Sequence, residues 1–106
     1  MSELHDMKKV EIITGGAQLE QVKELLAKLG ATGYTIIPNI SGMGHHGVRT
    51  GHLMFNETTS LAMLISVVPE DLVKPIHAGL MPLFERHSGV LFVSDVLVGR
   101  PQQFAD

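Results

Sequence analysis

The chain has 106 residues and a mass of 11.5 kDa, which is the size of a single domain. Hydrophobic residues make up 44% and charged residues 18% of the sequence, a balance that excludes a disordered or polyelectrolyte chain. The net charge of −3 argues against nucleic acid as a partner, and the absence of cysteine excludes disulfide frameworks, thiolate zinc sites and cysteine nucleophiles. A cysteine-free chain whose polar N-terminus does not resemble a signal peptide predicts a cytoplasmic location.

The first half of the chain predicts a strand, a helix and a second strand. Residues 8–14 are rich in β-branched side chains, which is typical of a short strand. Leucine and valine then recur at helical spacing over 19–29, so an amphipathic helix is expected there, and Gly30 is placed to end it. Residues 34–40 predict another strand. Pro38 within it indicates an edge strand, a bulge or an early end of pairing, because proline has no backbone N–H to donate.

The second half predicts a strand, a helix and a final strand. Residues 58–68 end in the most strongly apolar, β-branched run of the chain. A proline and two acidic residues follow, and apolar residues then continue at helical spacing over 72–84, with Pro82 expected to distort the end of that helix. A turn over 86–89 leads to the last predicted strand, 90–98.

This order predicts an α+β fold, the ferredoxin-like βαββαβ sandwich, with both helices on one face of a four-stranded antiparallel sheet. The chain divides into a core of about 7–100, which contains a long loop of about 41–57 between the second and third strands, and a tail over 99–106. In a single chain, the other face of this sheet would stay uncovered. The apolar content of the sequence is also high for a domain of this size. Self-association into a symmetric homo-oligomer is therefore expected.

The long loop concentrates glycine and histidine. Hairpins usually need roughly two to five connecting residues, so a segment as long as 41–57 indicates either a functional loop or disorder. Gly42 and Gly44 would let backbone N–H groups approach an anion such as phosphate, although Gly-x-Gly alone has low specificity. Arg49 is the only formally charged residue between Gly42 and His52, and composition alone favours a solvated loop charge for it.

Three loop histidines, His45, His46 and His52, raise a metal hypothesis, because neutral imidazoles suit Zn, Cu or Ni. Their spacing matches no common ligand pattern, and no carboxylate is well placed beside them, so incidental loop histidines are the favoured interpretation. A metal-binding trimer of similar fold, like the copper-tolerance proteins, is the first alternative function. A small ferredoxin-like enzyme is the second, but the sequence assembles no general acid, base and nucleophile. We therefore expect a protein that is not an enzyme.

Several segments together resemble the PII signalling superfamily. Residues 33–37 and 41–44 are similar to the passage from a Gly-x-Thr strand into the Gly-x-Gly base of the long T-loop. Residues 48–51, Val-Arg-Thr-Gly, resemble a T-loop stretch of PII-like proteins linked to bicarbonate uptake. Residues 89–96 are similar to the last long strand of PII proteins. The element order agrees as well, so the resemblance covers roughly residues 7–100.

The resemblance implies a homotrimer with adenine nucleotide in the clefts between subunits and a T-loop that engages a target protein. The nucleotide-binding residues that it implies share positions with the family's motifs: Thr35 near the adenine, Gly42, Gly44 and Arg49 near the phosphates, Gly89 facing the nucleotide from the other side, and Arg100 after the last strand.

Departures from the family pattern narrow the expected ligand. Val90 stands where the family has a phosphate-binding lysine, which favours ADP or AMP over ATP. His46 replaces the glutamine that helps to hold 2-oxoglutarate, so that ligand is not expected. The likeness is strongest to PII-like proteins of carboxysome and bicarbonate-transport systems, which implies bicarbonate as a second ligand with Arg49 as its candidate partner. The target would then be a bicarbonate transporter or a carboxysome component.

Overall fold

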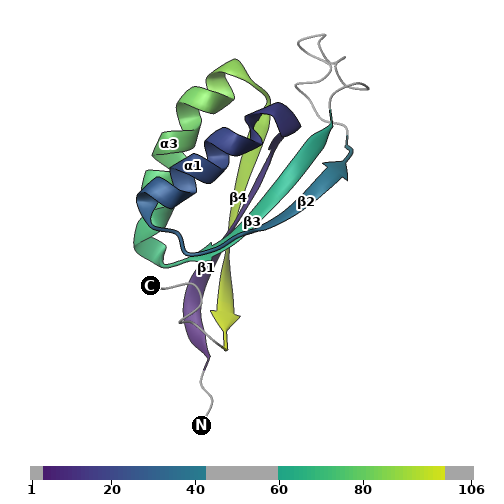
Figure 1. Cartoon of the computed structure of the whole chain (residues 1–106). Coiled ribbons are helices and arrows are strands. Elements are labelled where there is room, and N and C mark those ends of the chain that lie inside the picture. The colour runs from purple at the N-terminus through teal and green to yellow at the C-terminus, as the bar shows by residue number, and fades with distance from the viewer. Residues whose placement is uncertain (1–3, 43–59, 100–106) are drawn as a thin grey trace.

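The computed structural model of the chain describes residues 4–42 and 60–99 (Figure 1). Short 3-10 turns, η1 and η3, precede the two long helices. The elements in chain order are β1 (His5–Gly15), η1 (Gly16–Gln18), α1 (Leu19–Leu29), β2 (Thr35–Ile40), β3 (Leu61–Val68), η3 (Glu70–Leu72), α3 (Val73–Arg86) and β4 (Gly89–Val98).

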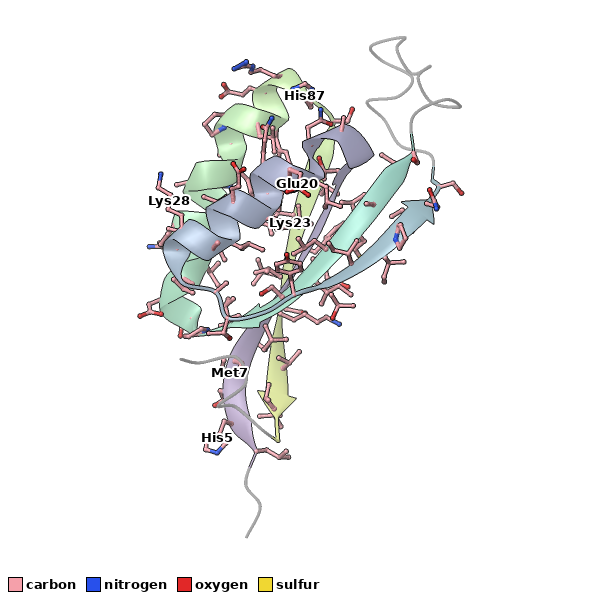
Figure 2. All side chains as sticks on the ribbon, viewed as in Figure 1. His5, Met7, Glu20, Lys23, Lys28 and His87 are labelled. Carbon is pink, nitrogen blue, oxygen red and sulfur yellow. The ribbon has the colours of Figure 1, made fainter. Side chains whose placement is uncertain are left out.

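The described strands form one antiparallel sheet in the order β2-β3-β1-β4, and α1 and α3 lie together on one of its faces (Figure 1). The ferredoxin-like α+β prediction is therefore confirmed. The β1–β4 pair extends past β3, since β3 ends at Val68 opposite Lys8 whereas β4 continues to Val98 opposite His5. Figure 2 shows His5 and Met7 on this two-stranded extension.

The core lies between the helices and one face of the sheet. Alternate residues of β1 and β3 point into it, as the period of two in a strand requires. Each helix is amphipathic and packs its apolar side into the core. The outer sides carry charged residues; on α1, Lys23 donates a hydrogen bond to Glu20 over 2.8 Å (Figure 2). The core side chains, each 0–1% exposed, are Val10, Ile12, Val22, Leu26, Leu64, Val68, Ile76 and Leu80.

The opposite face of the sheet, which we call the open face, carries no described helix (Figure 1). Its residues alternate with the core residues along each strand and are mostly apolar: Ile37, Met63, Ile65, Val67, Ile13, Val90, Phe92 and Val96. Charged side chains on it include Lys9 and Glu11, whose Nζ and Oε2 atoms lie 3.9 Å apart. An apolar sheet face that no described element covers agrees with the predicted self-association.

The element bounds differ from the predicted ones at several places. β1 begins at residue 5 rather than 8 because its first residues pair with β4. Gly89 is the first residue of β4, so the turn expected over 86–89 shrinks to His87 and Ser88. Pro82 lies inside α3, which nevertheless runs to Arg86. Gly30 ends α1 with φ 93°, the left-handed conformation predicted for this helix end.

Candidate functional site

Three of the candidate nucleotide-binding residues lie in the described part of the chain. Thr35 is exposed at the start of β2 and pairs with Ile65, which places it on the open face. Gly42 is exposed just beyond the end of β2, and Gly89 begins β4. Gly44, Arg49 and Arg100 lie outside the described residues, as do the histidines at 45, 46 and 52.

Gly42 and Gly89 belong to the same end of the sheet. The last residue of β2, Ile40, pairs with Leu61, and Leu61 pairs with Gly15 at the end of β1. Gly89 pairs with Thr14, the residue before Gly15. The base of the long loop, the β1–α1 turn and the start of β4 therefore meet at one end of the molecule.

The same topology keeps Thr35 and Gly89 apart within one chain. β2 and β4 are the two edge strands, and both central strands separate them. Three strand spacings correspond to about 14 Å across the sheet. The two residues can therefore lie next to each other only if they come from different chains.

Gly89 also has a packing role that the sequence did not reveal. A Cβ atom at this position would lie 2.2 Å from Cε1 of Phe84. The aromatic ring, partly buried against the core, occupies the space that any other side chain would need. Close approach of α3 to β4 therefore requires glycine here, independently of any ligand.

Ser66 fixes the chain segment that leads into Thr35, a role that the sequence did not predict. The Ser66 hydroxyl, on a side chain 2% exposed, donates to the carbonyl of Gly33 over 2.7 Å. This bond ties the connection between α1 and β2 to the centre of the sheet. The available signal was a polar residue in the helix-facing series of β3, where Ala62, Leu64 and Val68 are apolar.

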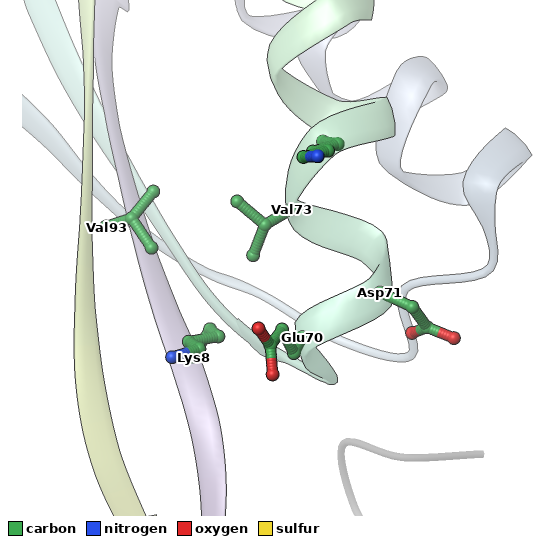
Figure 3. Close-up of a pocket in the computed structure, with 6 residues that line it drawn as sticks. Lys8, Glu70, Asp71, Val73 and Val93 are labelled. Carbon is green, nitrogen blue, oxygen red and sulfur yellow. The ribbon is translucent and has the colours of Figure 1, made fainter.

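A separate hollow lies at the other end of the sheet, between α3 and the β1–β4 pair (Figure 3). Its volume is about 670 Å³, and Val73 and Val93 point toward each other across it (Figure 3). Lys8 lines it and forms an ion pair with Asp95, whose carboxylate raises the pKa of Lys8. The hollow contains none of the candidate nucleotide-binding residues.

Within residues 4–42 and 60–99, no group of three or more His, Asp or Glu side chains is placed to hold a metal ion. In the same part of the chain, neither long helix has the length and apolar character needed to cross a bilayer.

Comparison with known proteins identifies the family. The sequence model of the family "Nitrogen regulatory protein P-II" matches residues 7–103. No curated protein matches the chain.

Solved structures of PII-like proteins align with this chain over nearly its whole length. CPII from Thiomonas intermedia K12, bound to ADP, AMP and acetate, is 48% identical, with 98% of this chain and 99% of that chain covered and a TM-score of 0.85. CPII bound to ADP, AMP and bicarbonate is 49% identical over 98% of each chain, with a TM-score of 0.83. A PII-like signalling protein from Thermus thermophilus is 25% identical over 96% of this chain and 98% of that chain, with a TM-score of 0.76. On its sequence, fold and topology, the chain belongs to the P-II family of nitrogen regulatory proteins.

Proposed function

We propose that this protein is a regulatory sensor, not an enzyme, that binds ADP or AMP in the clefts between the subunits of a homotrimer. PII proteins are trimers that interact with partner proteins. The observation that carries the proposal is the position of Thr35 and Gly89 on opposite edges of the sheet, beside an apolar face that no described element covers. Rotation of one subunit against the next would bring the two edges together and cover the open face.

Each candidate residue takes a role that its chemistry supports. Thr35 contacts the adenine from the start of β2. The loop base supplies backbone N–H groups of Gly42 and Gly44 to the phosphates, and Arg49 supplies positive charge. Gly89 closes the cleft from the neighbouring edge, and Arg100 adds a second cation after β4.

A planar anion is the proposed second ligand. The related CPII protein is bound to acetate in one structure and to bicarbonate in another, together with ADP and AMP in both. Both anions present two oxygens on one trigonal carbon, and the fork of an arginine guanidinium matches that geometry. Arg49 is therefore the proposed bicarbonate partner in this chain.

The ligands would regulate the protein through the long loop. A ligand that binds one arrangement of the 41–57 loop better than another shifts the loop toward that arrangement. The loop would then expose or withdraw the surface that meets a partner in inorganic-carbon metabolism, such as a bicarbonate transporter or a carboxysome component in the cytoplasm. Val90, in place of a lysine, leaves less positive charge for a triphosphate and favours ADP and AMP over ATP.

Calorimetric titration of the assembled protein with ADP, AMP and ATP, each with and without bicarbonate, tests the proposal. We expect ADP and AMP to bind more tightly than ATP, and bicarbonate to change nucleotide affinity. Arg49→Ala should weaken bicarbonate binding, whereas Lys28→Ala, which removes an exposed charge on α1, should not. Absence of heat with every nucleotide at millimolar concentration, on a protein confirmed as folded and assembled, would refute the proposed function.

A further inference from the structure

The edge strand β2 contains a β-bulge directly before the base of the long loop. Ile37 pairs with Met63 and Ile40 pairs with Leu61, so two residues of β2, Pro38 and Asn39, stand opposite one residue of β3. Asn39 has φ 57°, and among the described residues no other non-glycine residue has a positive φ. The irregularity is therefore a built conformation at a single residue.

The bulge reverses the alternation of β2. In a regular strand, residues 37 and 40 would point to opposite faces, because successive side chains alternate. Here both pair with residues of the open face, Met63 and Leu61, which alternate with the buried Ala62 and Leu64. The part of β2 after Asn39 is therefore shifted in phase relative to its first residues, and Gly42 follows this shifted segment by two residues.

The local sequence encodes this geometry. Pro38 has no N–H, so it leaves no donor unpaired where the ladder is interrupted. Asparagine tolerates the left-handed conformation better than most residues, whereas a β-branched side chain there is strained. Strained or unusual backbone conformations concentrate at functional sites, and bulges commonly redirect groups beside them.

We propose that Asn39 is a positioning residue for the phosphate end of the nucleotide site: its left-handed backbone directs the loop base, including Gly42, toward the phosphates. The inference rests on the proposed function. Thr35, assigned to the adenine, lies before the bulge in the regular part of the ladder, where it pairs with Ile65. A change at Asn39 should therefore disturb phosphate contacts more than adenine contacts.

Asn39→Val tests the proposal, with Asn39→Gly as the matched variant that keeps the left-handed conformation accessible. Affinities for ADP and AMP are measured by calorimetry on variants whose folding and assembly are verified by circular dichroism and sedimentation. We expect Asn39→Val to weaken ADP binding at least about tenfold, the size of one lost hydrogen bond to a charged group, and AMP binding by less. Asn39→Gly should bind both nucleotides within about twofold of the unmodified protein.

If Asn39→Val does not fold, Asn39→Ala is used instead, because alanine strains the left-handed conformation less. It too should weaken ADP binding more than AMP binding. Unchanged ADP affinity in the strained variant, or equal losses for ADP and AMP, would overturn the positioning role. Weak binding by Asn39→Gly as well would also overturn it, because the asparagine side chain and not the backbone conformation would then matter. Failure of the unmodified protein to bind either nucleotide would instead refute the proposed function.

Discussion

The two faces of the sheet differ in how their apolar side chains are covered, although the same strands build both. In β3, Leu64 is 0% exposed beneath the helices, whereas its neighbours Met63 and Ile65 are only partly covered on the open face. The helix-covered face is completed within one chain. The open face is equally apolar in β3 but has no described element over it, which makes it the surface best suited to contact another copy. The helix-covered face therefore stabilises the fold of each chain, whereas the open face is the surface available for assembly.

The largest effect on folding should follow from a cavity in the helix-covered face. Leu64→Ala removes most of a fully buried side chain and should lower the free energy of unfolding by about 2–5 kcal/mol. Met81→Ala, at an exposed position of α3, is the control and should lower the free energy of unfolding distinctly less. Chemical denaturation followed by circular dichroism measures both. Equal losses for the two variants would contradict the stabilising role given to the burial of Leu64 beneath the helices.

Overpacking the same face should cost somewhat less. Gly89→Ala places a methyl group where the Phe84 ring lies, so the ring must move, and we expect a loss of about 1–3 kcal/mol in the free energy of unfolding. Gly33→Ala is a suitable control because an added Cβ there meets no atom within 4 Å. Thermal denaturation compares the two. An unchanged melting temperature for Gly89→Ala would contradict the packing role given to this glycine.

Removing either of two buried hydroxyl groups on the helix-covered face should have different effects on stability. Ser66 donates to the Gly33 carbonyl, so Ser66→Ala should destabilise the fold by about 1 kcal/mol. Oγ1 of Thr14 is buried without a hydrogen-bond partner, so Thr14→Val should leave stability unchanged or raise it by about 1 kcal/mol. Denaturant titrations measure the free energy of unfolding of both variants. A loss of stability in Thr14→Val as large as that in Ser66→Ala would contradict the expected difference between the two hydroxyl groups.

The smallest effect concerns the exposed ion pair between Lys8 of β1 and Asp95 of β4. The Asp95 carboxylate accepts a hydrogen bond from Lys8 and raises the pKa of Lys8 above 10.5. The stabilisation from this pair is therefore complete below that pH and is lost as the pH rises through the higher pKa of the folded state. Asp95→Asn should reduce the loss of stability between neutral pH and about pH 11. Identical pH profiles for the variant and the unmodified protein would show that the pair contributes nothing.

Local sequence patterns predicted the elements but not their mutual placement. The helix ending at Gly30 and the interruption at Pro38 follow from backbone chemistry that acts within a few residues. The first residues of β1 carry no strand signal of their own, and only pairing with β4 extends the strand to His5. The phase shift caused by Asn39 depends on register, which a single strand cannot reveal.

The candidate site was predictable to a similar degree. Thr35, Gly42 and Gly89 were proposed from motifs, but their separation on two edges required the strand order. Ser66 was missed because a lone serine in an apolar strand does not indicate which backbone group it will contact. Their assignment to a nucleotide remains a proposal.

The proposed nucleotide site would exist only between chains, so a variant that folds but does not assemble should lose it. Phe92 is 52% exposed on the open face and pairs with Glu11, so Phe92→Lys adds a charge that is paired within the chain but unfavourable in an apolar interface. Met81→Lys, on an exposed position of α3, is the control. Sedimentation combined with ADP calorimetry should show Phe92→Lys as a folded single chain without ADP binding, and Met81→Lys as an assembly that binds. A folded, dissociated Phe92→Lys chain that binds ADP with unchanged affinity would contradict the account.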